Sequence, residues 1–321
     1  MREARRFGAA ELTYADWGPA RVGATTVLAL HGLTSTSQVW QALADSLPDA
    51  RVVAPDLAGR GGSVGVAAGP GLVGHAEMVL RLVHELGLDE RRPGERRPGE
   101  RRSGERRPGE LASGERAAGG AGPGGLVVIG HSMGAFLAPL VAARLGDRVR
   151  RVVLVDGGVA PERSLLIRRP VVRALFRTQM KIVGRPWRDA AAFVDRVEGR
   201  AIRNRPELRA PLIGWAEYAL AGPPGRLRPR LDAAQCTADA VNALTGEATL
   251  GALAGSAVPV HLIAAARGAD DRKPAFLSDA AIEAGRRELP RLIVERIEGN
   301  HLTMLFDARL AAAVAAPRGL L

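Results

Sequence analysis

A five-residue segment, Gly130-His131-Ser132-Met133-Gly134, constrains the fold of this chain more than any other feature. It follows a short apolar run typical of a buried strand, at 126–129, and precedes a helical pattern of small and apolar residues at 134–145. The two glycines leave room for a sharp turn between strand and helix that would expose the Ser132 hydroxyl. The pattern therefore predicts a sheet with a helix packed on it and a serine presented at the carboxyl end of one strand.

Other apolar segments typical of strands alternate with helical patterns along the chain. The strand-like segments lie at 26–30, 52–54, 152–155 and 260–264, and the helical patterns at 38–47 and 72–87. Short apolar strands that alternate with helices are typical of a mostly parallel sheet covered by helices on both faces. The predicted fold class is therefore α/β.

Two segments interrupt this alternation. Residues 91–110 repeat the motif RRPGE, once with Ser for Pro, and a Gly-rich run follows, so we expect the insert 89–125 to be disordered and dispensable for chemistry. Residues 157–255 have a helical character broken by prolines and no clear strand, which is typical of a cap over a site. The expected organisation is a core of 1–156 and 256–321 with a helical cap of 157–255.

The composition narrows the possible partners. Although the net charge is +11, nearly all basic residues are Arg in a chain rich in Ala and Gly, which indicates a compositional bias rather than a nucleic-acid surface. No apolar stretch is long enough to span a membrane, and the first residues lack the apolar region of a signal peptide, so we expect a cytoplasmic protein that does not bind membranes. The lone Cys236 excludes an internal disulfide. No residue spacing suggests a metal or nucleotide site, so no cofactor is expected, and the sequence leaves the oligomeric state open.

The residues around Ser132 are those that a nucleophilic serine needs. A serine hydroxyl becomes reactive when a neighbouring base takes its proton and nearby donors stabilise the oxyanion that forms. The helix that begins after Ser132 directs its free N–H groups and its positive dipole end at the site. We expect the Met133 amide to be one oxyanion donor and the Leu33 amide, from the loop after the strand at 26–30, to be the other. His31 is expected to shape that loop rather than to act as a base.

Four motifs together resemble the α/β-hydrolase superfamily, and they occur in the family's order. They are His31-Gly32, the turn Asp56-Leu57-Ala58-Gly59-Arg60-Gly61-Gly62-Ser63, the Gly130–Gly134 segment and Gly299-Asn300-His301. The resemblance covers nearly the whole chain apart from the insert. It implies an α/β-hydrolase fold with an eight-stranded, mostly parallel sheet, a cap after the sixth strand, and a triad of serine, acid and histidine. In this family Asp56 usually supports its loop.

Position in the chain indicates the base of the implied triad but leaves its acid open. Among the six histidines only His301 lies late, in a loop after an apolar strand at 292–294, so we expect it to be the base. The acid stays open between Asp156, which directly follows the strand at 152–155, and Asp270 or Asp271 in the loop after the strand at 260–264.

These features favour a serine hydrolase that forms an acyl-enzyme on Ser132, with a small-molecule ester as the expected substrate. Acyl transfer to another acceptor, or a non-catalytic ligand-binding member of the fold, are the alternatives. Residues 157–257 carry 16 Arg and Lys against 9 Asp and Glu. This excess suggests either an anionic substrate that is drawn inward or simply a solvated, Arg-rich surface.

Overall fold

The computed structural model describes residues 5–18, 24–69, 71–88, 125–160, 168–245 and 249–316. The RRPGE repeat, and with it the predicted disorder of the insert, lies outside these residues. The remaining ranges contain every segment for which the sequence predicted a strand or a helix of the core.

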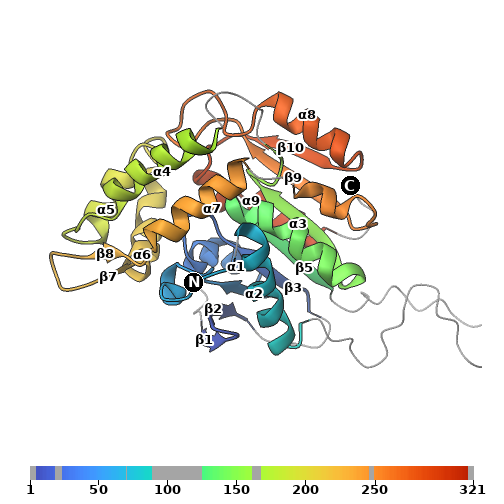
Figure 1. Cartoon of the computed structure of the whole chain (residues 1–321), viewed down its shortest axis with the longest axis horizontal. Helices are drawn as coiled ribbons and strands as arrows, with labels where there is room; N and C mark the ends of the chain where they lie inside the picture. The colour runs from blue at the N-terminus through green and yellow to red at the C-terminus, as the bar shows by residue number, and fades with distance from the viewer. Residues whose placement is uncertain are drawn as a thin grey trace, which may run out of the picture.

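An eight-stranded sheet forms the centre of the structure, with the strand order β1-β2-β4-β3-β5-β6-β9-β10 (Figure 1). The two β1/β2 and β2/β4 pairs are antiparallel and the other neighbours are parallel. The strands are β1 (Arg5–Ala9), β2 (Leu12–Trp17), β3 (Thr26–Leu30), β4 (Arg51–Pro55), β5 (Leu126–His131), β6 (Val149–Val155), β9 (Val260–Ala265) and β10 (Ile293–Ile297). The predicted α/β class and the mostly parallel sheet are confirmed.

Helices cover both faces of this sheet because its strands are apolar on both sides. In β3, Val27 and Ala29 belong to one buried cluster, whereas Leu28 and Leu30 belong to another. The first cluster also contains residues of α1 (Gln41–Ser46) and α9 (Ala308–Ala315). The second contains residues of α2 (Gly71–Glu85), α3 (Met133–Leu145) and α8 (Asp279–Glu288). Alternate side chains of one strand therefore hold the two helical layers.

The chain between β6 and β9 forms a group of helices that extends from the middle of Figure 1 to its left side. It contains α4 (Arg169–Val183), α5 (Ala190–Val197), α6 (Arg209–Ala219) and α7 (Ala233–Thr245). α4 packs against α7, and α5 packs against α6. We call this group the β6–β9 helices.

One expectation for this segment is wrong, because it does contain strands. β7 (Leu220–Ala221) pairs antiparallel with β8 (Arg228–Pro229). Each strand has only two residues, so neither could produce the alternating pattern by which a strand is recognised in a sequence. No helix in the part of the chain that the structure describes combines the length and apolar character needed to cross a bilayer.

Candidate active site

Ser132 lies at a strained turn between β5 and α3. Its backbone has φ 53° and ψ −116°, a conformation that non-glycine residues rarely adopt. The Ser132 amide donates a 2.9 Å hydrogen bond to the Val155 carbonyl in β6, and the Ser132 carbonyl accepts a 3.0 Å bond from the Ala135 amide. The turn is therefore fixed from both sides, with Ser132 as the residue that precedes α3 and lines the adjoining cavity.

The two flanking glycines are required by close backbone approach. A Cβ atom at Gly130 would lie 2.1 Å from the Gly134 carbonyl oxygen, and one at Gly134 would lie 2.1 Å from the Leu30 carbonyl oxygen. Both distances are far below van der Waals contact. Helix α3 can thus start directly against β5 and β3 only when glycine occupies both positions, as the sequence pattern indicated.

Asp156 and His301 meet at the carboxyl ends of β6 and β10. His301 Nδ1 and Asp156 Oδ2 are 2.7 Å apart. Asp156 is fully buried, and its second oxygen, Oδ1, accepts a 3.0 Å hydrogen bond from the Ala265 amide of β9. The carboxylate therefore accepts from both the histidine ring and the sheet backbone, which fixes the orientation of the imidazole.

The other two candidate acids do not contact His301. Asp270 is exposed to solvent. Asp271 accepts hydrogen bonds from Arg267, Asn204 and Asn300, at 2.9, 2.7 and 2.9 Å. Burial raises the pKa of the Asp271 carboxyl, but these hydrogen bonds outweigh burial and leave the pKa below its ordinary value. Asp271 thus supports Asn300, the residue before His301, rather than the imidazole itself.

Two further histidines shape the site without serving as free bases. His131 Nε2 donates a 2.8 Å bond to the His301 carbonyl, and its ring centroid lies 4.6 Å from that of His301. Burial, with the nearby His301, holds the pKa of His131 well below its usual range. The His31 Nε2 atom accepts from the Leu57 amide at 2.9 Å, so Nδ1 carries the proton and donates to the Gly32 carbonyl at 2.8 Å. His31 therefore shapes its loop, as expected from the sequence.

A buried arginine holds the loop that contains Leu33. Arg60 Nε donates to the Leu33 carbonyl at 2.9 Å, and Nη2 lies 3.8 Å from the Met133 sulfur. Arg60 forms a 2.5 Å ion pair with Asp239 of α7, and both side chains are completely buried. His75 Nε2 also lies 2.9 Å from Asp239. The two residues predicted to supply oxyanion donors are therefore anchored through one charged network to the β6–β9 helices.

Asp56 supports the same region from another direction. Its Oδ1 accepts from the Ser37 amide at 2.7 Å and its Oδ2 from the Gly62 amide at 2.8 Å, while the Tyr218 hydroxyl of α6 also donates to Oδ2. These hydrogen bonds come from loop backbone and from a tyrosine. Asp56 therefore supports its loop, which is the role that the resemblance to the family implied.

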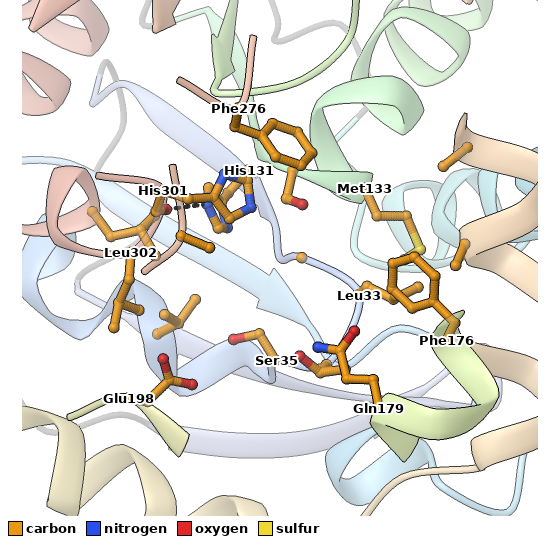
Figure 2. Close-up of a pocket in the computed structure, with 18 of the residues that line it drawn as sticks. Leu33, Ser35, His131, Met133, Phe176, Gln179, Glu198, Phe276, His301 and Leu302 are labelled. Carbon is orange, nitrogen blue, oxygen red and sulfur yellow. Dashed lines mark hydrogen bonds between the residues drawn. The ribbon is translucent and has the colours of Figure 1, made fainter. Parts of the chain in front are cut away.

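A cavity of about 310 Å³ lies between the sheet and the β6–β9 helices, and Figure 2 shows the side chains around it. Ser132, His301, Leu33 and Met133 all line it. Its volume is at the lower end of the range of small-molecule sites, and its walls are mostly apolar. Residues far apart in the sequence therefore converge on one partly open cavity that can hold a small molecule.

The match to a protein-family model decides the family. The model described as "Alpha/beta hydrolase family" matches residues 27–314, which include all of the site described above. The chain belongs to the alpha/beta hydrolase family. In this alpha/beta hydrolase the match begins within β3, at Val27, and ends within α9, at Val314.

Comparison with a curated protein gives a partial relative of this alpha/beta hydrolase. It is 30% identical over 162 residues to the lipase LipV of Mycobacterium tuberculosis. The match covers 50% of this chain and 46% of LipV, so the chain spans about half the length of the curated relative it matches.

Solved structures share the fold over nearly the whole alpha/beta hydrolase chain. E-2-(acetamidomethylene)succinate hydrolase superposes with a TM-score of 0.66 at 20% identity, covering 98% of each chain. A thioesterase domain from the curacin biosynthetic pathway gives 0.66 at 18% identity, covering 98% of this chain and 100% of the other. An alpha/beta hydrolase from Novosphingobium aromaticivorans gives 0.63 at 20% identity, covering 98% and 96%.

Some residues of the alpha/beta hydrolase site were not found from the sequence. Phe276 packs on His301 with ring centroids 4.3 Å apart, and Glu198 brings a carboxylate into the cavity wall from the end of α5. Neither residue stands in a local motif, so only the folded chain identifies them. Among the described residues, no group of three His, Cys, Asp or Glu side chains is placed to hold a metal ion.

Proposed function

We propose that this chain is a carboxylic-ester hydrolase that works through an acyl-enzyme on Ser132. The observation that carries the proposal is the shared cavity. Ser132, at its strained turn, and His301, which pairs with Asp156, line the same mostly apolar cavity. The partial relative LipV is a lipase, which supports esters as the substrate class.

In the proposed reaction, His301 Nε2 takes the Ser132 proton as the hydroxyl oxygen attacks the ester carbonyl carbon. Asp156 holds Nδ1 protonated and stabilises the imidazolium that results. The Leu33 and Met133 amides donate to the oxyanion of the tetrahedral intermediate. The C–O bond then breaks, and His301 returns its proton to the leaving alcohol.

The second half of the reaction releases the acid. His301 takes a proton from water, the hydroxide oxygen attacks the acyl carbon, and a second tetrahedral intermediate forms in the same oxyanion site. The bond to Ser132 Oγ breaks, and the proton on His301 returns to the serine. We propose that the β6–β9 helices, within residues 157–255, act as the cap that excludes bulk water during these steps.

Hydrolysis of 4-nitrophenyl esters of graded chain length tests this proposal, with Ser132→Ala as the control. The small cavity predicts that short acyl chains react faster than long ones. An absence of turnover for every chain length, or equal turnover by Ser132→Ala, would contradict an ester hydrolase that uses Ser132.

Acyl transfer is the second candidate, because a thioesterase domain is among the structures that share the fold. Adding a small alcohol during ester turnover separates the two activities. Formation of the new ester in preference to the free acid would identify a transferase. A ligand-binding protein without catalysis would bind esters without turning them over. The cytoplasmic location expected from the sequence stays a prediction.

A further inference from the structure

Glu198 places a carboxylate in the cavity wall, and no Lys or Arg of the described residues forms an ion pair with it. The residue follows α5, where its amide donates to the Val194 carbonyl at 2.8 Å and ends the helix. Its side chain is partly buried and lines the cavity, and Figure 2 shows the carboxylate directed into that space. The backbone geometry at the end of α5 therefore presents the carboxylate to any molecule bound there.

Several acidic residues of this part of the chain have an arginine counter-ion, and two that have none among the described residues, Glu217 and Asp232, are exposed to solvent, whereas Glu198 is partly buried. Asp189, Asp195 and Glu207 lie in the same Arg-rich segment, and each forms an ion pair with an arginine. Glu198, by contrast, makes no ion pair or side-chain hydrogen bond with any residue that the structure describes, and no described Lys or Arg lines the cavity. Burial raises the pKa of its carboxyl to about 7, and the neighbouring His301 limits the rise.

The rest of the described cavity wall contains few groups that could compete for this carboxylate. Besides Glu198, the charged or basic side chains that line the cavity are His301, from the loop after β10, and His131, from the end of β5. The lining residues of α4, α6 and α7 are uncharged, and the wall includes the aromatic rings of Phe176, Trp215 and Phe276. Carboxylates and aromatic faces together are typical of sites that bind ammonium groups.

We infer that Glu198 recognises the substrate by binding a positively charged, ammonium-type group that the ester carries. This inference rests on the proposed function and adds the substrate's charge to it. An anionic substrate, which the basic residues of 157–257 had suggested, would meet a carboxylate and no Lys or Arg among the described lining residues. None of the described arginines of that segment lines the cavity, so they do not serve as substrate ligands there.

A matched pair of esters tests the inference. In 4-nitrophenyl 4-(trimethylammonio)butanoate and 4-nitrophenyl 5,5-dimethylhexanoate, one atom differs, N⁺ against C, so shape is kept and charge is changed. The quantity to measure is the kcat/KM of the cationic ester divided by that of the neutral ester. Glu198→Gln should lower this ratio about tenfold near pH 8.5, because the amide keeps the shape of the side chain and removes its charge.

The wild-type protein gives an independent measurement. Between about pH 8.5 and pH 5.5 its ratio should fall as the Glu198 carboxyl is protonated. The part of this fall that is due to Glu198 should be absent from Glu198→Gln. Glu217→Gln is the matched control, because Glu217 is an exposed residue of α6 that does not line the cavity, and its ratio should equal that of wild type.

Equal ratios in wild type and Glu198→Gln would overturn the inference while leaving ester hydrolysis intact. If neither ester is hydrolysed, the proposed function fails, and the inference is judged from binding of phenyltrimethylammonium. The dissociation constant should then rise in Glu198→Gln and, for wild type, rise as the pH falls. A dissociation constant that changes neither in Glu198→Gln nor with pH would overturn the inference. If Glu198→Gln did not fold, a wild-type dissociation constant that stayed the same as the pH fell would overturn it.

Discussion

His301 Nδ1 lies 2.7 Å from Asp156 Oδ2, although 145 positions separate the two residues in the sequence. Replacing Asp156 with Asn removes the acceptor that keeps the proton on Nδ1, so the imidazole can no longer serve as a base toward Ser132. We expect kcat to fall by about 10⁴-fold, the loss seen when a triad acid is replaced in this way. Steady-state hydrolysis of a 4-nitrophenyl ester measures it.

Asp271→Asn is the matched control for that experiment. Its carboxylate contacts Asn300 and Arg267 rather than His301, so kcat should fall far less than in Asp156→Asn. If Asp271→Asn lost as much activity as Asp156→Asn, or if Asp156→Asn stayed near wild type, the assignment of the acid would be wrong.

The Arg60–Asp239 pair should contribute to both stability and turnover. Asp239→Asn leaves the guanidinium of Arg60 buried without its counter-ion, which should destabilise the fold by about 3–5 kcal/mol. Because Arg60 also holds the Leu33 carbonyl, kcat should fall as well. Urea unfolding measures the first effect. Asp195→Asn removes an exposed pair with Arg209 and should change the unfolding midpoint little; comparable losses in the two variants would contradict the account.

Stability should fall as the medium becomes acidic, partly because of His31. Burial lowers its pKa to about 4 in the folded protein, against about 6.5 in the unfolded chain. Between these values the unfolded state binds the extra proton, so the free energy of unfolding decreases as the pH falls, by about 3 kcal/mol for this group. His31→Gln should show a shallower dependence on pH across that window. An unchanged slope would contradict the assignment.

The Ser132 turn should tolerate no side chain at Gly134. In Gly134→Ala the new Cβ would overlap the Leu30 carbonyl oxygen, so the variant should fail to fold or lose most of its stability. Gly214→Ala in α6 has open space around the new atom and should instead stabilise the helix by about 0.5–1 kcal/mol. Thermal unfolding of both variants checks the contrast, and a stable, active Gly134→Ala would refute it.

The core fold was predictable because its signals are local. Apolar runs such as 126–129 have few alternatives to a buried strand, and the glycines of the Ser132 turn mark one sharp connection. β1 and β2 were not predicted, because the turn between them lacks the usual local signal. Their two-residue turn, Ala10-Glu11, has positive φ at both positions, yet it lacks the Asn-Gly or Asp-Gly pair that normally indicates such a turn.

The site was predictable only in part because distant segments complete it. Position along the chain indicated His301, but the choice between Asp156 and Asp271 depends on which strand end lies beside the imidazole. Glu198 carries no local signal at all. It is one of several acidic residues in an Arg-rich segment, and only the packing of the β6–β9 helices directs it into the cavity.

The most direct measurement of the central claim is the mass of the intact protein after treatment with a fluorophosphonate, followed by peptide mapping. A reactive serine displaces fluoride and keeps the phosphonyl group. We predict one adduct per chain, located on Ser132, that is absent from Ser132→Ala and slow to form in Asp156→Asn. An unlabelled protein, or an adduct on any other residue that persists in Ser132→Ala, would contradict Ser132 as the nucleophile.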